Sequence, residues 1–293
     1  MSRSGFVALA GRPNVGKSTL VNAMVGRKVA IVSDKPQTTR RAIRGVLTTR
    51  DFQLVLTDLP GVQRPRDALT TRMQRRVESE LAEADAALFV VNGDQGVGGG
   101  GDRWIAEALG RAAVPVAIAV NKVDRLNHTR TVQALHEAGE LVPEAEVFPI
   151  SARTGQGVPP LLDYLTGLLP EGPFYFPPED VSDQPEHVRL AELVREQVLA
   201  RTRQEVPHAV EVQVEEIEER DGLIAVRAVM WVETESQKGI VIGARGHMIK
   251  AIGTAARLEL ERELGEHVHL DLSVRVRRSW RADDALLDRL GIT

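Results

Sequence analysis

Gly11-Arg-Pro-Asn-Val-Gly-Lys-Ser18 fits the P-loop pattern G-x-x-x-x-G-K-[ST] at every fixed position, and it follows directly on a short apolar run. In a P-loop, backbone N–H groups curl around phosphate oxygens, and the dipole of the next helix adds positive potential. We expect Lys17 to reach the β- and γ-phosphates of a nucleotide and the Ser18 hydroxyl to ligate Mg²⁺. The predicted phosphate site comprises Gly11, Asn14, Val15, Gly16, Lys17, Ser18 and Thr19.

Short apolar runs on both sides of this loop predict strands buried in a parallel sheet. They are residues 6–10, 114–120 and 147–150. Helices are expected between them, and one follows Arg66, where a core-facing stripe is formed by Leu69, Met73, Val77 and Leu81. The alternation predicts a doubly wound α/β domain that binds its ligand at the C-terminal ends of the strands.

A composition break separates this domain from the rest of the chain. Residues 169–180 contain four prolines and clustered aromatic residues, which favour an extended connection. We therefore predict an α/β domain over 1–170, a linker over 171–186 and a second domain over 187–293.

The second domain has a different order of elements, α-β-β-α-α-β. A helix is expected over 188–203, strands over 209–217 and 223–232, and a hairpin turn at Glu219-Arg-Asp-Gly between these strands. Two helices surround Gly243–Gly246, a strand covers 270–276, and a last helix covers 282–290. This order predicts an α+β fold for the second domain.

Three further short motifs of the first domain complete the predicted nucleotide site, and the last two of them point to guanine. Asp58-Leu-Pro-Gly61 closes the strand 52–57, where Asp58 is placed to hold Mg²⁺ through water and Gly61 to offer its N–H to the γ-phosphate. Asn121-Lys-Val-Asp124 follows another strand end, and the Asp124 carboxylate can accept hydrogen bonds from the guanine ring N–H and amino group. Adenine lacks both donors and would leave that carboxylate unpaired.

The remaining residues of these motifs complete the expected base site. Lys122 is expected along the face of the base, and Asn121 is expected to tie its loop to the P-loop. Ser151-Ala152 caps the strand that ends at Ile150, so that the Ala152 N–H can meet the guanine carbonyl.

In their order and strand context, these motifs resemble the GTPase superfamily. The resemblance implies that Thr39, with Thr38 as the close competitor, binds Mg²⁺ only when the γ-phosphate is present. The glutamine that orients the attacking water in Ras-like enzymes is replaced by Val62. Related GTPases with an apolar residue there and a P-loop asparagine bind K⁺ beside the phosphates, and Asn14 matches that asparagine. Lys17, Thr39, Asn14 and Gly61 are thus the expected catalytic residues.

The second domain contains a G-x-x-G loop, Gly243-Ala-Arg-Gly246, between two helical patterns. In KH domains such a loop clamps the backbone of a single-stranded nucleic acid. The order α-β-β-α-α-β is also that of the bacterial, type II, KH domain. The domain is acidic overall, with 16 Lys and Arg against 24 Asp and Glu from residue 171 onward, but residues 236–258 contain no acid. The predicted RNA-binding residues are Lys238, Gly243, Ala244, Arg245, Gly246, Lys250, Arg275, Arg277 and Arg278, the last three in a second acid-free cluster.

Nearly the whole chain resembles the Era family of GTPases. The specific matches are Pro36-Gln-Thr-Thr-Arg40, Leu169-Pro-Glu-Gly-Pro173, residues 236–243 and Val276-Arg-Arg-Ser-Trp-Arg281. The resemblance implies a GTP-hydrolysing assembly factor of the small (30S) ribosomal subunit that binds 16S rRNA near its 3′ end. It also implies GTP, GDP and Mg²⁺ as ligands, a monomer, and peripheral contact with the inner membrane surface, although the sequence has no strong amphipathic anchor.

Composition excludes other classes of protein. The chain has 293 residues, a net charge of −4 and no cysteine, so it has no disulfide framework, thiolate nucleophile or cysteine-ligated metal. No apolar run reaches the ~20 residues of a membrane span, and the N-terminus lacks a signal-peptide core. We expect a cytoplasmic protein. Two alternatives stay open: a regulatory GTPase whose second domain binds a protein or membrane surface, and a P-loop ATPase with an incidental Asn-Lys-x-Asp.

Overall fold

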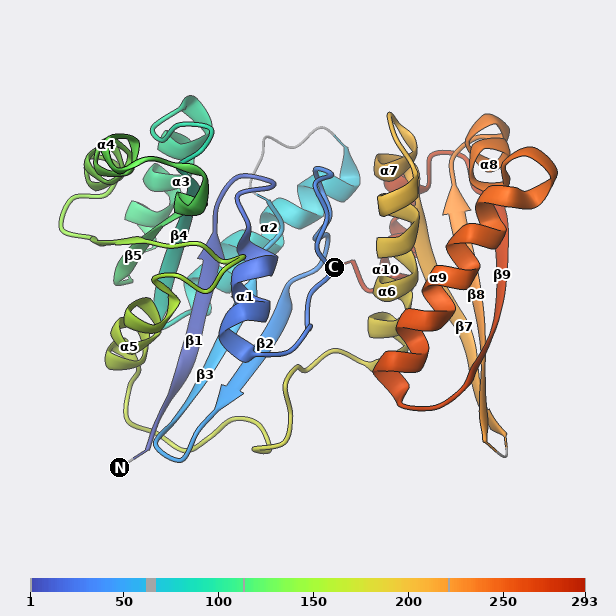
Figure 1. Cartoon of the computed structure of the whole chain (residues 1–293), viewed down its shortest axis with the longest axis horizontal. Coiled ribbons are helices and arrows are strands. Elements are labelled where there is room, and N and C mark those ends of the chain that lie inside the picture. Colours follow the sequence, from blue (N-terminus) through green and yellow to red (C-terminus); the bar gives the residue numbers. More distant parts are fainter. Residues whose placement is uncertain (1, 62–66, 113, 221, 293) are drawn as a thin grey trace.

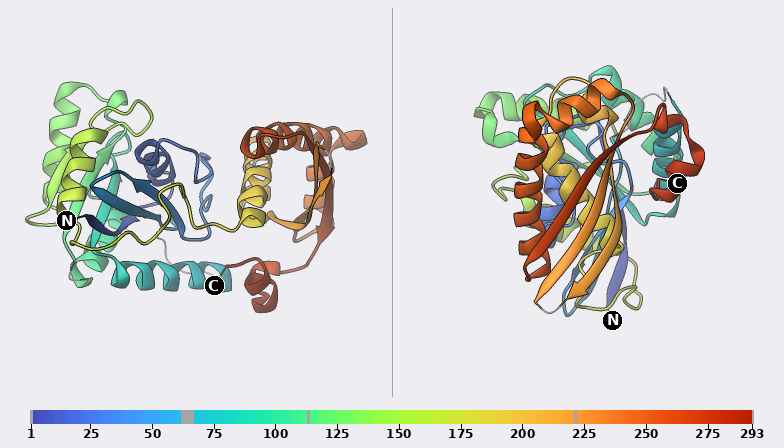
Figure 2. Two further views of the ribbon diagram at one scale, coloured as in Figure 1. Left: turned by 90° about the horizontal axis from the view of Figure 1, so that it is seen from below. Right: turned by 90° about the vertical axis from the view of Figure 1, so that its right-hand side faces the viewer.

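The computed structural model describes residues 2–61, 67–112, 114–220 and 222–292 and consists of two units (Figure 1). The first unit is a six-stranded sheet with helices on both faces. The second is a three-stranded sheet with helices packed on one face (Figure 2). No helix in the described ranges is long and apolar enough to cross a membrane.

The six-stranded sheet is parallel except for one edge strand, which confirms the predicted doubly wound domain. Its strand order is β2-β3-β1-β4-β5-β6, and only β2 runs antiparallel to its neighbour, β3. The strands are β1 (Arg3–Ala10), β2 (Ile43–Thr48), β3 (Phe52–Asp58), β4 (Ala86–Asn92), β5 (Val116–Asn121) and β6 (Glu146–Pro149). In this register Leu9 pairs with Asp58 and Asn92 with Asn121, so the motifs that follow these strands gather at one edge of the sheet.

Five helices cover this sheet in the described part of the first unit. They are α1 (Lys17–Val25), α2 (Ala68–Glu83), α3 (Gly100–Arg111), α4 (His128–Gly139) and α5 (Val158–Leu168). Helices α1 and α5 pack against one face, while α2, α3 and α4 pack against the other. The predicted stripe of α2 is buried, but only Val77 and Leu81 face the sheet. Leu69 and Met73 instead join a separate apolar cluster with the C-terminal segment of the chain.

The proline-rich connection lies along the first unit. The fully buried Gln53 side chain accepts hydrogen bonds from the backbone N–H groups of Tyr175 (2.7 Å) and Phe176 (2.9 Å), and it donates to the Phe176 carbonyl. Further along, the Val46 N–H of β2 donates to the Val181 carbonyl at 2.9 Å. The linker is therefore attached to the sheet edge for most of its length.

The second unit has the topology of a type II KH domain. It consists of α6 (Glu186–Arg201), α7 (Val206–Ala209), β7 (Glu211–Arg220), β8 (Leu223–Val232), α8 (Glu235–Ile242), α9 (His247–Leu264) and β9 (Val268–Val276). Strand β7 is antiparallel to β8, and β8 is parallel to β9. The predicted hairpin joins β7 and β8, although Asp221 of its turn lies outside the described residues. The one-turn helix α7 has no counterpart among the sequence predictions.

The last helix, predicted over 282–290, is present but shorter than predicted. A 3₁₀ turn, Trp280–Ala282, is followed by the shorter helix α10 (Asp284–Arg289). Asp283 between them has non-helical backbone angles, and its side chain accepts a hydrogen bond from the Leu286 N–H at 3.0 Å. An aspartate in this N-cap position satisfies a backbone donor of the next helix, so the helix begins after it.

Candidate functional site

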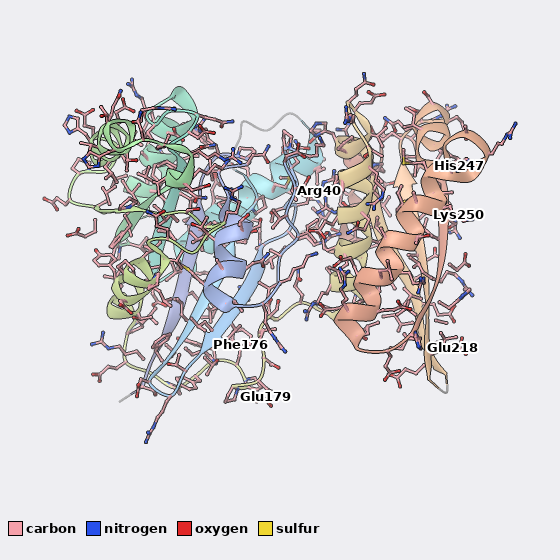
Figure 3. The ribbon with its side chains drawn as sticks, in the orientation of Figure 1. Arg40, Phe176, Glu179, Glu218, His247 and Lys250 are labelled. Carbon is pink, nitrogen blue, oxygen red and sulfur yellow. The ribbon has the colours of Figure 1, made fainter. Side chains whose placement is uncertain are left out.

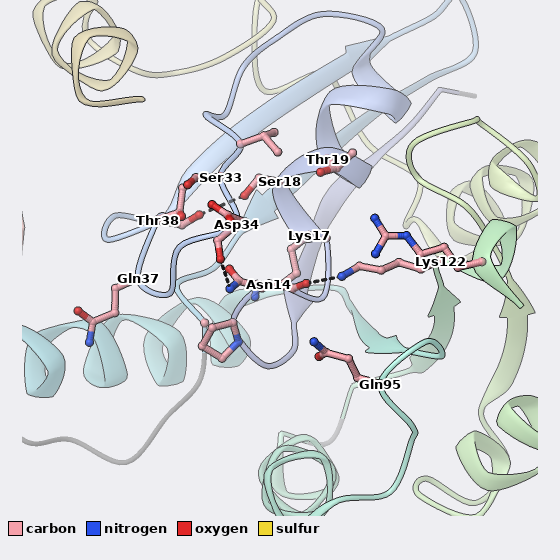
Figure 4. A pocket seen from close by; sticks show the side chains of 16 residues that line it. Asn14, Lys17, Ser18, Thr19, Ser33, Asp34, Gln37, Thr38, Gln95 and Lys122 are labelled. Atoms are coloured by element: carbon pink, nitrogen blue, oxygen red, sulfur yellow. Dashed lines mark hydrogen bonds between the residues drawn. The ribbon is translucent and has the colours of Figure 1, made fainter. Parts of the chain in front are cut away.

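The P-loop joins β1 to α1 at the edge where the strand ends gather, and it borders a cavity of about 420 Å³ (Figure 4). Gly16 has φ +104°, and a Cβ at this position would lie 2.3 Å from the Asn121 side-chain nitrogen. A side chain on Gly16 would therefore separate the P-loop from the loop after β5. This contact explains physically why the pattern requires glycine there.

Lys17 is buried at the start of α1, with its ammonium group inside the P-loop. Its Nζ donates to the carbonyl of Gly11 at 3.0 Å and to that of Arg12 at 3.2 Å. Burial lowers the pKa of Lys17 to about 8, and the nearby Asp58 carboxylate partly opposes that change. Burial likewise raises the pKa of Asp58, which Lys17 and two hydroxyl donors counteract. A phosphate would therefore meet a cation held in place by the loop itself.

Three oxygen-bearing side chains converge beside Lys17. Ser18 Oγ donates to Asp58 Oδ2 at 2.6 Å, Thr39 Oγ1 donates to the same oxygen at 3.3 Å, and the two hydroxyls lie 3.1 Å apart. Asp58 Oδ1 is buried without a hydrogen-bond partner in the described part of the chain. Thr38, the competitor of Thr39, instead donates to the Lys35 carbonyl at 2.6 Å. Thr39, and not Thr38, is therefore the threonine that contacts Ser18 and Asp58.

The loop after β5 is fixed to the P-loop by Asn121. Its Nδ2 donates to the Val15 carbonyl at 2.8 Å, as the sequence predicts, and its Oδ1 accepts from the backbone N–H groups of Lys122 and Ala152. The Ala152 N–H thus points to Asn121, whereas we expected it to meet the guanine carbonyl. Lys122 Nζ donates to the Asn14 carbonyl at 2.8 Å, so its stem crosses between the two loops (Figure 4).

Asp124 comes two positions after Lys122, which lines the cavity, and it lies beside the loop that contains Ser151. A hydrogen bond from Ser151 lowers the pKa of Asp124, and the positive charge of Arg153 acts in the same direction. Arg153 Nη2 lies 2.7 Å from Asp124 Oδ2. Arg153 is not among the predicted site residues, although its place directly after Ser151-Ala152 could have suggested it. Asp124 is therefore held as an anion that can accept hydrogen bonds.

Gly61 is packed against the P-loop at the phosphate end. A Cβ on Gly61 would lie 2.8–2.9 Å from atoms of Pro13, which leaves no room for a side chain. The Asn14 side chain donates to the Asp34 carbonyl at 2.6 Å and so joins the P-loop to the loop that contains Thr39. Val62, which replaces the water-orienting glutamine, lies outside the described residues.

The G-x-x-G loop lies between α8 and α9, as predicted. Gly243 has φ +71°, and a Cβ there would lie 2.9 Å from the Met248 backbone nitrogen; Arg245 and Gly246 also have positive φ. Lys238, Arg245 and Lys250 make no ion pair with any described residue, and Lys250 lies on α9 (Figure 3). The loop and the two helices beside it thus present cations that no described residue neutralises.

The second basic cluster is acid-free in sequence but not in space. Arg275 Nη1 lies 3.0 Å from Glu215 on β7, and Arg277 Nε lies 2.8 Å from Asp283. Arg281 Nη2 pairs with Glu233 at 2.8 Å, while Arg278 is exposed. Glu215 lies at a β-bulge in strand β7. These pairs weaken the positive potential that the sequence predicts around Arg275 and Arg277.

The P-loop, the base loop and the following KH fold define a P-loop GTPase with a C-terminal KH domain. Residues 6–122 match the family described as "50S ribosome-binding GTPase", and residues 205–281 match the KH domain family. GTPase Era of Mycobacterium sp. (strain KMS) is 45% identical over 296 residues, which cover 99% of this chain and 98% of that protein. GTPase Era of Mycolicibacterium paratuberculosis is 47% identical over 297 residues, which cover 99% and 98%.

Two solved structures share the whole fold. One is Era in complex with MgGDPNP and nucleotides 1506–1542 of 16S ribosomal RNA, with a TM-score of 0.96, 34% identity and full coverage of both chains. The other is a variant of Aquifex aeolicus Era bound to GDP·AlF4⁻, with a TM-score of 0.95, 34% identity and 99% coverage of both chains. This chain belongs to the Era family of GTPases, and it is a GTP hydrolase with a domain of an RNA-binding fold.

Proposed function

We propose that this chain uses GTP hydrolysis to control its binding to 16S rRNA near the 3′ end during assembly of the 30S ribosomal subunit. The main support is a P-loop GTPase site and an unneutralised KH loop in one chain whose fold agrees throughout with an Era bound to that RNA. The family described as "50S ribosome-binding GTPase" matches residues 6–122, and this range does not include the KH loop. We also propose that the protein acts as a cytoplasmic monomer.

The KH loop provides the first test. We expect the double variant Arg245→Glu, Lys250→Glu to bind single-stranded RNA at least about tenfold more weakly in filter binding at moderate salt. The loss of two phosphate contacts also flattens the slope of log K against log salt by about 1.4. Arg262→Glu is the matched control, because Arg262 lies near the other end of α9 and is already paired with Glu259. Equal losses in the control and the double variant would contradict this placement of the RNA site.

The oxygen ligands beside Lys17 fit Mg²⁺. Hard divalent cations prefer carboxylate and hydroxyl oxygens. Ser18, Thr39 and Asp58 supply them, and the buried Asp58 Oδ1 has no hydrogen-bond partner among the described residues. We propose that Ser18 and Thr39 are direct ligands and that Asp58 acts through water. A bound Mg²⁺ would neutralise charge on the β- and γ-phosphates.

Potassium is the proposed substitute for an arginine finger. Asn14 Oδ1 accepts no hydrogen bond from the described residues, and the Asp34 carbonyl lies next to the same side chain. We expect hydrolysis at least about tenfold faster in K⁺ than in Na⁺ buffer, since a fixed positive charge beside the phosphates stabilises the transition state. Turnover measured in the two buffers checks this, and Asn14→Ala should abolish the difference. Equal rates for the unmodified protein would rule out the ion.

The loop around Thr39 is shared between the two units, which supports a nucleotide switch. Arg195 of α6 donates to the Thr38 carbonyl, Arg40 Nη1 donates to the Val210 carbonyl at 2.6 Å, and Ile31 is buried in the core of the KH domain. Figure 3 places Arg40 at the boundary between the units. We propose that the γ-phosphate, by holding Thr39, also fixes this boundary.

The switch predicts that RNA affinity depends on the nucleotide. We expect RNA affinity with a non-hydrolysable GTP analogue to differ at least about fivefold from RNA affinity with GDP. Thr39→Ala should remove the difference, because it deletes the hydroxyl that faces Ser18 and Asp58. Binding isotherms with each nucleotide measure the effect. Identical affinities would refute the switch but leave both binding activities intact.

A further inference from the structure

The chain does not end with the KH fold but returns to the first unit. Beyond β9, residues 280–292, here called the C-terminal clamp, lie beside α2 (Figure 2). Leu69 and Met73 of α2 are buried in one apolar cluster with the clamp residues Trp280, Leu286, Leu287, Leu290 and Ile292. The residues that match the KH family end at 281, so nearly all of the clamp lies beyond that match.

One arginine of α2 holds both ends of α10. Arg72 Nη1 lies 2.5 Å from Asp288 Oδ1 and donates to the Ile292 carbonyl at 2.9 Å, while Nη2 lies 2.8 Å from Asp284 Oδ1. Among the described residues, α2 is the first helix after Gly61 along the chain. The clamp is thus attached to the helix that follows the γ-phosphate motif.

The clamp also touches the loop that contains Thr39. Trp280 is fully buried and donates from Nε1 to the Ala209 carbonyl at 2.7 Å. The guanidinium carbon of Arg40 lies 5.4 Å from the centroid of the Trp280 ring. Arg40 directly follows Thr39 in the chain. The two segments expected to respond to the γ-phosphate therefore meet the same short segment of protein.

At its other end the clamp is joined to the KH sheet. The Arg277 N–H donates to the Val232 carbonyl at 2.8 Å, which continues the pairing of β8 and β9. Its guanidinium binds Asp283, the residue that caps α10. Arg281 binds Glu233, which directly precedes the N-cap residue of α8. A displacement at the end of β9 or the start of α8 would therefore reach α10.

We propose that the C-terminal clamp transmits the nucleotide state of α2 to the RNA-binding surface, and RNA occupancy back to α2. This inference rests on the proposed RNA binding, and it names the segment through which the nucleotide would regulate that binding. Two sites coupled through such an element change each other's affinity by the same factor. The clamp suits this role because its contact with α2 consists of a small apolar cluster and one arginine, so it can form and break as a unit.

The test compares the ratio of RNA affinities with a non-hydrolysable GTP analogue and with GDP. We expect Arg72→Ala to bring this ratio at least threefold closer to one, and the double variant Asp284→Asn, Asp288→Asn to have the same effect from the other side of the contact. Arg75→Ala is the matched control, because Arg75 is exposed on the same helix and has no ion-pair partner in the described ranges. Arg72→Glu should also bring the ratio closer to one, and adding Asp288→Arg should restore it.

The outcomes separate the two proposals. A protein that binds no RNA with either nucleotide refutes the proposed function. A protein that binds RNA with a ratio of one refutes the nucleotide switch and, with it, the clamp proposal. A ratio that differs from one but survives Arg72→Ala and the paired aspartate variant overturns the clamp proposal alone. Failure of Asp288→Arg to rescue Arg72→Glu also overturns it, because a general loss of folding, and not the contact, would then explain the fall.

Discussion

Asp124→Asn should weaken GTP binding by roughly 100-fold while strengthening the binding of xanthosine triphosphate. The substitution replaces a carboxylate that accepts two hydrogen bonds from guanine with an amide that can accept only one and must donate the other. The lost charge-assisted bonds correspond to about 3 kcal/mol. Xanthine has a carbonyl in place of the guanine amino group, so it offers the acceptor that the asparagine amide needs. Competition titrations with GTP, xanthosine triphosphate and ATP measure the change.

Arg153→Ala is the matched control for that experiment. It removes the cation 2.7 Å from Asp124, but Arg153 is 69% exposed, and exposed ion pairs contribute less than about 1 kcal/mol. We therefore expect Arg153→Ala to change GTP affinity by only a fewfold and to leave the base preference unchanged. If Asp124→Asn bound GTP as tightly as the unmodified protein, the assignment of the guanine-recognising residue would be wrong.

Local signals made the nucleotide domain predictable from the sequence. The P-loop directly follows an apolar strand, and Asp58 and Asn121 are the last residues of two other strands. The strands run parallel, which brings their ends to one edge of the sheet. The bond from Asn121 to the Val15 carbonyl follows from this geometry. The G-x-x-G loop could also be predicted from a local signal, because the helices on both sides of it are visible in the periodicity of the sequence.

Contacts between distant segments were not predictable in the same way. We predict positive charge around Arg275 because this residue has no acidic neighbour in the sequence. The pairing of β7, β8 and β9, however, brings Glu215 beside Arg275. Likewise, nothing near Arg40 in the sequence indicates that it is buried against Glu211. A run of basic residues in the sequence predicts a basic surface only where the fold brings no acidic residue of another segment beside it.

The buried charges at the domain boundary carry the second large prediction. Arg40 Nη1 lies 2.6 Å from Glu211 Oε2, and Arg41 and Arg195 each lie 2.6 Å from Glu192. Glu211 is fully buried among these three arginines. Their positive charges lower its pKa from 4.5 to about 2 despite the opposing effect of burial. Removing this carboxylate would leave two buried arginines, Arg40 and Arg195, and the partly buried Arg41 with Glu192 as their neighbouring anion.

Glu211→Gln should therefore lower the free energy of unfolding at pH 7 by about 3 kcal/mol, the usual scale for breaking a buried ion pair. A pKa lowered from 4.5 to about 2 corresponds to about the same free energy. Because the pKa of Glu211 is lower in the folded than in the unfolded protein, its contribution is complete above pH 4.5. It is lost as pH falls toward 2.

The difference between the two proteins should consequently shrink with acidity, which guanidinium unfolding at pH 7 and pH 3 measures. Glu216→Gln is the matched control on the same strand, because the Glu216–Arg227 pair is about half exposed and should contribute less than about 1 kcal/mol at either pH. A loss in Glu211→Gln that stayed constant from pH 7 to pH 3 would mean that lost packing, and not the carboxylate charge, causes it. A loss that fades with acid would instead show that the loop containing Thr39 is held to the KH domain by this charge.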